Sequence, residues 1–349
     1  MERKQTKSIS IGKVKIGGGA PIAVQSMTKT DTRDVEATIN QIQELEEAGC
    51  EIIRVAVPDE KAARKLKKIK ERVSIPLIAD IHFNYKLALL AIDSGVDGLR
   101  LNPGTLGEKW KIAEVVKRAL QQSIPIRIGI NAGSLEKDLL KKYRHPTPEA
   151  LVESALRNIR LLESFDFNLI KVSLKASDVV TTINAYRVIA GQTDYPLHLG
   201  ITEAGSLING IIKSAIGIGI LLSEGIGDTI RVSLTAHPIE EVRVGQGILQ
   251  ALKLRIFRPE IISCPTCGRC AINLENIVKE LENRISGCKK NLTVAIMGCA
   301  VNGPGEAREA DIGIAGGKRS GILFKKGKPQ EKVAVANLLN RLIEEINRY

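Results

Sequence analysis

The sequence predicts an α/β protein, with an N-terminal (β/α)8 TIM-type barrel followed by a smaller C-terminal α+β domain. Eight short apolar runs rich in β-branched residues alternate with helical stretches, most of them roughly 20 to 30 residues apart. Polar residues follow or interrupt these runs near their ends, as at the catalytic face of such barrels. The alternation stops near residue 255, and five of the six cysteines lie beyond it. We therefore place the barrel at 1–255 and the second domain at 256–349.

The eight runs justify one barrel strand each. In order they are PIAVQSM (21–27), EIIRVAV (51–57), IPLIADI (75–81), DGLRLNP (97–103), PIRIGIN (125–131), LIKVSLK (169–175), PLHLGIT (196–202) and DTIRVSL (228–234). Amphipathic helical stretches lie between them, for example 34–49, 60–73 and 146–165, with acidic or proline starts and a glycine ending the first. A doubly wound open sheet is the alternative arrangement for the same pattern.

Beyond residue 255 the order of signals changes. A cysteine loop is followed by a helical stretch, an apolar strand, the loop MGCAVNGPGEA (297–307), further strands and a closing helix. This order predicts an α+β domain.

Composition limits the partners. The chain of 349 residues has a formal net charge of +12, but its basic residues are interspersed with 39 acidic ones and aromatic residues make up 3%. Without a basic tail or stacking aromatics, we expect no nucleic-acid partner. An anionic small molecule or an acidic protein explains the excess charge better.

The first ten residues are polar, and no apolar run is long enough to span a membrane. We therefore predict a cytoplasmic protein without a membrane partner. In that compartment the cysteines are expected to be thiols, metal ligands or redox groups rather than disulfides. Cys50, after Gly49 and before a strand, is expected to be a buried apolar residue.

Barrel chemistry occurs where the strands end, so the polar residues at these ends are the candidate site. Five cations come from five different strands, and planar guanidinium groups match phosphate oxygens in pairs, which predicts a clamp for a diphosphate. The simpler alternative is that each arginine pairs with a barrel carboxylate, but only Asp80 and Glu203 can be placed there. The polar residues at the strand ends are Arg54, Asp80, His82, Arg100, Asn102, Arg127, Asn131, Ser173, Lys175, Thr202, Glu203, Arg231 and Ser233.

Glu203, beside glycines in GITEAG, is the preferred carboxylate for proton transfer, with a role as counter-ion to an arginine as the alternative. His82 and His198 lie on different strands without a second ligand at metal spacing. We therefore expect them to be hydrogen-bonding or core histidines.

Cys264 and Cys267 form a CxxC pair, which by itself fits either a redox pair or half of a zinc site. A second close pair for zinc is missing, and Cys270 is not followed by the residues of a ferredoxin repeat. The remaining pattern is a CxxC pair, a distant third thiol at Cys299 and a loop carrying Glu306. Three thiolates can hold three irons of a cubane cluster and leave the fourth iron for an oxygen ligand.

These residues carry a resemblance. CPTCGR, followed by MGCAVNGPGEAREADIGIAGG, resembles the signature of the 4-hydroxy-3-methylbut-2-enyl diphosphate synthase family of the methylerythritol phosphate pathway of isoprenoid biosynthesis. VQSMTKTDTRD, ADIHF, LRLNPG, RIGINAGSL, KASD, LGITEAG and IRVSLT resemble the barrel motifs of that family in the same order. The resemblance covers almost the whole chain and matches the two-domain bacterial form.

The resemblance implies a 4Fe-4S cluster held by Cys264, Cys267, Cys299 and Glu306. It implies reductive ring opening and dehydration of 2-C-methyl-D-erythritol 2,4-cyclodiphosphate to (E)-4-hydroxy-3-methylbut-2-enyl diphosphate with two electrons from flavodoxin or ferredoxin. It also implies a head-to-tail homodimer and a role for Glu203 near the leaving hydroxyl. The residues that it places around the diphosphate are Arg54, Arg100, Arg127, Asn131, Lys175, Thr202, Arg231 and Ser233.

Cys270 departs from the family pattern, in which a residue such as threonine is usual after CGR. We expect it to be a partly buried bystander, with a spare cluster ligand as the alternative, and Cys288 to be an unliganded thiol. Two functions of other classes stay open on the residues alone. They are a zinc-stabilised barrel enzyme without redox chemistry and a scaffold or nucleic-acid-binding protein.

Overall fold

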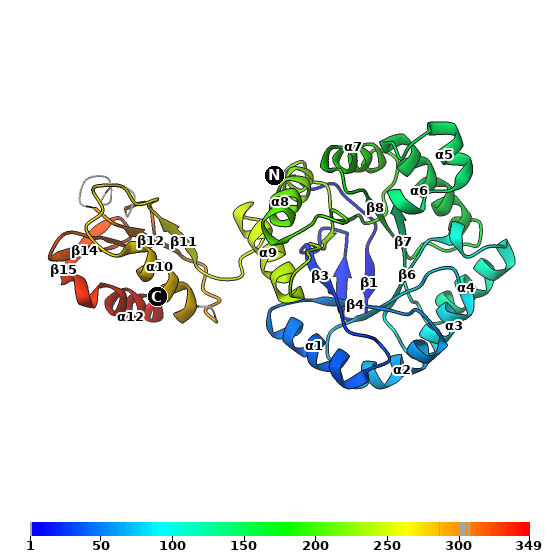
Figure 1. Cartoon of the computed structure of the whole chain (residues 1–349), viewed down its shortest axis with the longest axis horizontal. Coiled ribbons are helices and arrows are strands. Elements are labelled where there is room, and N and C mark those ends of the chain that lie inside the picture. The colour runs from blue at the N-terminus through cyan, green and yellow to red at the C-terminus, as the bar shows by residue number, and fades with distance from the viewer. Residues whose placement is uncertain (1, 286, 300–304, 306–307) are drawn as a thin grey trace. The chain divides into compact units, whose positions relative to one another are not determined.

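The structure is a computed structural model that describes residues 2–285, 287–299, 305 and 308–349. Its chain divides into two compact units, Met1–Arg255 and Ile256–Tyr349. In Figure 1 the first unit is a ring of helices around an inner ring of strands, and the second is a small sheet with helices packed against it. Within the described residues, no helix is both long and apolar enough to cross a membrane.

Eight parallel strands form the wall of the first unit, and each lies inside one of the eight predicted runs. They are ordered β8-β7-β6-β5-β4-β3-β10-β9, and a bridge between Val172 and Leu197 joins the two ends of the series. The predicted barrel is thus confirmed, and the open sheet is excluded. The strands are β3 (Ala23–Met27), β4 (Ile52–Ala56), β5 (Leu77–Asp80), β6 (Gly98–Leu101), β7 (Ile126–Asn131), β8 (Ile170–Lys175), β9 (His198–Leu199) and β10 (Thr229–Ile230).

Helices follow the strands and surround the ring (Figure 1). Acidic residues start several of them, because a carboxylate satisfies free N–H groups of the first turn. Asp34 accepts from Ala37 N at 3.1 Å, and Asp59 accepts from Ala62 N at 2.8 Å. The helices are α1 (Val35–Glu47), α2 (Glu60–Lys70), α3 (Tyr85–Asp93), α4 (Lys109–Gln121), α5 (Lys137–Tyr143), α6 (Pro148–Glu163), α7 (Val179–Ala190), α8 (Leu207–Ser223) and α9 (Pro238–Ala251), with short 3-10 turns η1 (Pro103–Thr105) and η2 (Ala132–Ser134).

A hairpin that the sequence analysis did not anticipate precedes the barrel. Its strands β1 (Ile9–Ile11) and β2 (Val14–Ile16) are antiparallel. Ile9, Ile11 and Ile16 form one apolar cluster with residues near the starts of barrel strands, among them Ala23 and Ile52. The hairpin therefore packs at the amino-terminal end of the barrel, and the carboxyl ends of the strands are left for the site.

The second unit contains a five-stranded sheet ordered β11-β12-β13-β14-β15, parallel from β11 to β13 and antiparallel from β13 to β15. Alternate residues face opposite sides, as in any strand. Val294 and Ile296 join the core that includes Leu281 and Leu342 of the helices. The elements are β11 (Glu260–Ser263), α10 (Leu274–Arg284), β12 (Thr293–Met297), β13 (Ile312–Ala315), β14 (Ser320–Lys325), β15 (Lys328–Ala334), η3 (Val335–Asn337) and α12 (Leu338–Arg348). The expected α+β fold is confirmed, with β11 as an addition.

Candidate functional site

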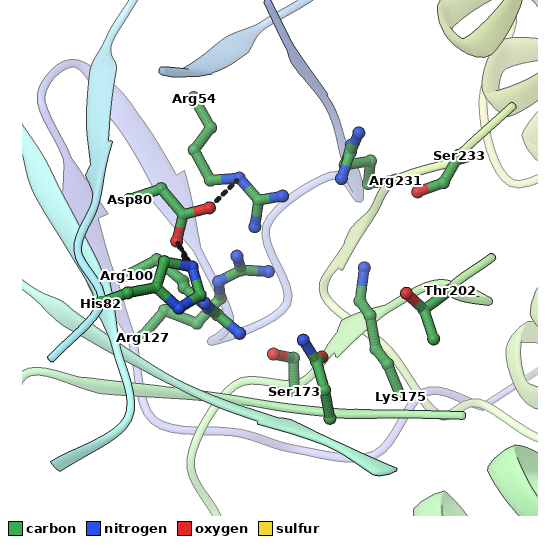
Figure 2. A pocket seen from close by; sticks show the side chains of 11 residues that line it. Arg54, Asp80, His82, Arg100, Arg127, Ser173, Lys175, Thr202, Arg231 and Ser233 are labelled. Carbon is green, nitrogen blue, oxygen red and sulfur yellow. Dashed lines mark hydrogen bonds and ion pairs between the residues drawn. The ribbon is translucent and has the colours of Figure 1, made fainter. Parts of the chain in front are cut away.

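A polar pocket opens at the carboxyl ends of the barrel strands. Figure 2 shows side chains from β4 to β8, and from the segments after β9 and β10, converging on one space. Each of the eight residues that the resemblance places around the diphosphate lines this pocket. The complete lining is Arg54, Asp80, His82, Arg100, Arg127, Asn131, Ser173, Lys175, Thr202, Arg231 and Ser233.

Strand register explains why residues distant in the sequence meet here. In neighbouring parallel strands, residues paired by register point to the same side. Asp80, Arg100 and Arg127 are such partners on β5, β6 and β7, and Asn131 pairs with Lys175 on β8. Because these side chains point into a closed ring, they are gathered without help from any loop.

Two glycines make room for the cations. A Cβ on Gly129 of β7 would lie 3.0 Å from Arg100 Cζ and would overlap the guanidinium. A Cβ on Gly200, just after β9, would lie 2.6 Å from Lys175 Nζ. Both distances are too short for a side chain at either position, so these glycines allow Arg100 and Lys175 to extend across the pocket.

Asp80 is the anion at the centre of the arginines. Arg100 NH1 lies 3.2 Å from its Oδ1, and Arg54 Nε lies 3.6 Å from its Oδ2 (Figure 2). Burial alone would raise the pKa of Asp80, but Arg54, the hydrogen bond with His82 and Arg100 outweigh burial and hold it below its usual range. His82 Nε2 lies 2.8 Å from Arg100 NH1, so His82 is the hydrogen-bonding residue that was expected.

The other carboxylate near the cations is not the one expected. Glu203 forms no ion pair within the described residues, whereas Glu241 of α9 lies 3.7 Å from Arg231 NH2 and 3.2 Å from Lys29 Nζ. The expectation that only Asp80 and Glu203 are available must therefore be corrected. Glu241 was missed because it lies on a helix that follows the last strand, where its side chain can still reach the mouth.

Positive charge exceeds negative charge in this pocket. Arg127 is 2% exposed, and in the described part of the chain its Nε and NH1 lack hydrogen-bond partners. Burial and the neighbouring Arg54 lower the pKa of Arg127, and burial lowers that of Arg54 to about 9 despite Asp80. The simpler alternative, one carboxylate for each arginine, is wrong for Arg127. A site with this charge and this many donors can hold a multivalent anion.

A buried lysine next to Arg127 was also missed. Lys171 of β8 is 1% exposed, and its Nζ lacks a hydrogen-bond partner among the described residues. His198 is fully buried and its Nδ1 lies 2.8 Å from Thr229 Oγ1, which confirms the expected core histidine. The signal for Lys171 was available, because it is two residues before Ser173 and four before Lys175, and alternate strand residues face one side.

Two other candidates lie outside the pocket lining. Asn102 accepts from Gly104 N at 3.1 Å and thus caps the turn η1. Glu203 is exposed and has a φ of 51°, in the left-handed region that non-glycine residues avoid. Strain of this kind concentrates at functional sites, and Glu203 directly follows Thr202 of the lining.

The cysteines proposed as ligands lie beyond the ends of two parallel strands of the second unit. Cys264 comes directly after β11, Cys299 comes two residues after β12, and Ser263 pairs with Ile296 in register. Gly298 N donates to Cys264 Sγ at 3.4 Å. The two segments therefore emerge at the same edge of the sheet, next to one another.

Cys267 is exposed in the turn after Cys264. Hydrogen bonds from the backbone and side chain of Arg269 lower its pKa, and the nearby Cys299 opposes this shift. Thiolates are the ligands that iron–sulfur clusters prefer, and N–H donors to their sulfurs are part of such sites. Within the described residues, no three metal-binding side chains are gathered closely enough to hold one ion. Glu306 lies outside the described residues.

The remaining cysteines pack as apolar residues. Cys50 is 3% exposed, its Sγ donates to Ile52 O at 3.2 Å, and burial raises its pKa to about 12. Cys288 packs against the core of the second unit. Cys270 packs against the same core and its Sγ donates to Ile272 O at 3.2 Å.

Solved structures resemble the barrel. A dihydropteroate synthase of Yersinia pestis matches 71% of this chain and 99% of its own with a TM-score of 0.51 at 13% identity. A 3-dehydroquinate dehydratase of Geobacillus kaustophilus matches 72% and 99% with a TM-score of 0.51 at 17% identity. At these identities the likeness shows the fold alone.

Sequence comparison is more specific. A relative from Thermodesulfovibrio yellowstonii, named 4-hydroxy-3-methylbut-2-en-1-yl diphosphate synthase (flavodoxin), is 60% identical over all of both chains. A relative of the same name from Geobacter sulfurreducens is 58% identical over 99% of this chain and 98% of its own. The model of the GcpE TIM-barrel domain matches residues 6–246, and that of the GcpE protein C-terminal domain matches 260–348. The chain therefore belongs to the GcpE family, through both of the domains that define it.

Proposed function

We propose that this protein is a 4-hydroxy-3-methylbut-2-enyl diphosphate synthase. It opens the ring of 2-C-methyl-D-erythritol 2,4-cyclodiphosphate and removes a hydroxyl as water, using two electrons. The observation that carries the proposal is the pairing, in one chain of this family, of a cation-rich barrel pocket with cysteine loops at the ends of two parallel strands. We assign diphosphate binding to residues 1–255 and electron supply to 256–349.

The pocket cations bind the diphosphate. Guanidinium groups donate paired, charge-assisted hydrogen bonds to phosphate oxygens, and an ammonium group adds a point charge. Because burial keeps these groups away from water, each contact is stronger than it would be on the surface. The diphosphate is bound by Arg54, Arg100, Arg127, Lys175, Arg231 and Ser233, with Asn131 and Thr202 beside it.

Asp80 orients the clamp. It holds Arg54 and Arg100 from one side through its two oxygens, which fixes the orientation of both guanidiniums in the pocket. His82 fixes the same Arg100 NH1 from the rim. This arrangement prepares the donors before the anion arrives, which reduces the ordering cost of binding.

Glu203 acts on the hydroxyl that leaves. Its strained backbone lies at the rim beside Thr202, where the carbon skeleton extends beyond the bound diphosphate. A carboxylic acid at this position can protonate a departing hydroxyl so that it leaves as water.

Cys264, Cys267, Cys299 and Glu306 hold a 4Fe-4S cluster in this proposal. When bound, the cluster would pass on, one at a time, the two electrons of the reduced carrier and would provide an iron that can accept an oxygen ligand. Three observations fit the donor set: two strands deliver their cysteines to one edge, Gly298 N donates to Cys264 Sγ, and Arg269 favours the thiolate of Cys267.

The electron donor is flavodoxin, the partner in the names of the relatives, and ferredoxin is the other acidic carrier that a chain of charge +12 would attract. We further propose a head-to-tail homodimer, as the family resemblance implies. The cytoplasm stays the predicted location.

The first experiment measures iron and acid-labile sulfide in anaerobically purified protein, together with its visible spectrum. We expect about four of each per chain and a broad charge-transfer band. Turnover of the cyclodiphosphate with reduced flavodoxin should then yield the open-chain diphosphate. Zinc without sulfide, or a loaded cluster without turnover, would contradict the proposed function.

A further inference from the structure

Two lysines of β8 point into the barrel at different depths. Lys175 lines the pocket and is 6% exposed, whereas Lys171, four residues earlier, lies deeper and is 1% exposed. Lys171 Nζ has no hydrogen-bond partner among the residues that the structure describes. A buried ammonium group without a partner is costly, and a buried amine that has lost its proton is less so.

The groups that face Lys175 are mostly cationic. They are Arg127 from β7, Arg231 after β10, Arg54 from β4 and Arg100 from β6. The carboxylates among these cations, Asp80 and Glu241, already contact Arg54, Arg100, Arg231 and Lys29.

The groups that face Lys171 come from four elements. Arg127 of β7 and Arg54 of β4 repel its charge, and Asp228 before β10 attracts it; a charge on Lys171 would add to the burial that lowers the pKa of His198 of β9. Asp228 is occupied elsewhere, since it accepts from Thr6 Oγ1 and from Leu197 N at 2.9 Å.

Arginine and lysine respond differently to this crowding. A guanidinium keeps its proton in proteins, whereas a lysine gives it up readily when it is buried. The pKa of both Lys171 and Lys175 lies well below the ordinary value. Burial is the largest cause, and repulsion by the charge of Arg127 is the second. In the substrate-free pocket, the repulsion between the cations is therefore reduced when the lysines, rather than the arginines, lose their protons.

We propose that Lys171 and Lys175 are proton-accepting groups of this pocket, uncharged in the substrate-free enzyme and protonated when the diphosphate binds. The inference rests on the proposed function for the identity of the anion. Lys171 is then a positioning residue: it does not touch the substrate, and it acts by adding a charge beside Arg127, its register partner, only when the anion is present. Binding thus takes up protons that the protein collects from solvent.

The sign of the pH dependence follows from linkage. Each phosphorus of a cyclic diphosphate carries a single strongly acidic hydroxyl, so the ligand keeps a fixed charge near neutral pH and any proton taken up goes to the protein. The bound anion raises the lysine pKa, so affinity is highest below the pKa of the free enzyme and falls as pH rises towards the pKa of the complex. Between the two values, Kd increases about tenfold per pH unit for each proton taken up.

Isothermal titration of the cyclodiphosphate into the anaerobic holoenzyme, without reductant, measures this uptake. Titrations near pH 8, above the ordinary range of histidine, are compared in buffers of different ionisation enthalpy. We expect an uptake of about one to two protons per chain, falling by roughly half a proton or more in Lys171→Met and in Lys175→Met. Lys67→Met, on the exposed side of α2, is the matched control and should keep the wild-type uptake.

A second measurement needs no ligand. Replacing an uncharged, unpartnered buried amine by an apolar side chain of similar shape is neutral or stabilising. Lys171→Met should therefore unfold at the same temperature as the wild type or higher. A large decrease would show a charged, structural Lys171 and overturn its part in the inference.

The outcomes separate the two proposals. Binding whose heat does not depend on the buffer, or uptake that neither lysine variant reduces, overturns the inference and leaves the proposed function standing. A cyclodiphosphate that does not bind to the wild type at all overturns both.

Discussion

The barrel mouth and the cysteine edge follow one rule of construction but differ in how complete they are. In both, functional residues lie at or just beyond the carboxyl ends of parallel strands, where neighbouring ends are brought together. In the barrel most of the cations are on the strands themselves, and Arg127 is 2% exposed. At the cysteine edge they are on loops, and Cys267 is exposed. A closed wall thus gathers the barrel cations without any ligand, whereas at the cysteine edge the proposed cluster would gather the thiols.

This difference has an energetic consequence. In the proposed site, ligands on loops would lose conformational freedom when the cluster binds, which would couple cluster binding to local order. The side chains of the barrel cations have already lost their conformational freedom when the barrel folds. We therefore expect substitutions at the cysteine edge to change cluster content and substitutions in the barrel to change substrate affinity.

Cys299→Ser should have the largest effect. We expect loss of the cluster absorption and of all turnover, because one of three thiolate ligands is removed, while the barrel still binds the cyclodiphosphate. Iron and sulfide analysis together with titration calorimetry measure both properties. Cys288→Ser is the matched control, since Cys288 packs on the core. A Cys299→Ser protein with full iron content and a wild-type spectrum would remove Cys299 from the ligand set.

Glu203→Gln tests the rim of the barrel. Loss of the ionisable proton should slow turnover by about a hundredfold or more with little change in substrate affinity and no change in iron content. Single-turnover kinetics and calorimetry report these two quantities, and Glu114→Gln on the exposed face of α4 is the control. If affinity decreased as strongly as the rate, Glu203 would be a binding residue instead.

Arg100→Met tests the clamp. Removing a charge-assisted contact should weaken substrate binding by about 3 kcal/mol, roughly a hundredfold in Kd, and leave the cluster spectrum unchanged. Arg118→Met is a suitable control, because Arg118 forms only an exposed pair with Asp93 at 3.4 Å. An unchanged Kd would show that the diphosphate lies elsewhere.

Cys270→Thr should have the smallest effect. Cys270 Sγ packs beside Gly298, close to Cys264, but it donates to Ile272 O and packs on the core of the second unit. We expect unchanged iron content and a change in unfolding free energy below about 1 kcal/mol. Loss of one iron per chain in this variant would identify Cys270 as a ligand.

Much of the molecule could be predicted from local patterns. Each of the eight strands lies within a run that was recognised by its β-branched residues, and Asp34 and Asp59 cap helices whose starts were expected. The five pocket cations were recognised because parallel strands of a barrel end on one face. These features follow from short segments and from one rule of topology.

Other features required the folded chain. The hairpin β1–β2 is too short to stand out in sequence, and it is stabilised by its contact with Ala23 and Ile52. Glu241 reaches Arg231 from the helix after the last strand, a contact that no spacing in the sequence reveals.

The barrel, the order of its strands and the residue types at their ends could be recognised from the sequence, because periodicity and strand-end chemistry are local. Which charges are compensated became clear only in the folded chain. Asp80 neutralises part of the clamp, Glu241 replaces Glu203 as the other anion, and Lys171 lies beside Arg127 with no hydrogen-bond partner for its Nζ in the described part of the chain. The physical reason is that the energy of a charge depends on its burial and on its neighbours in space, and both arise only when the ring closes.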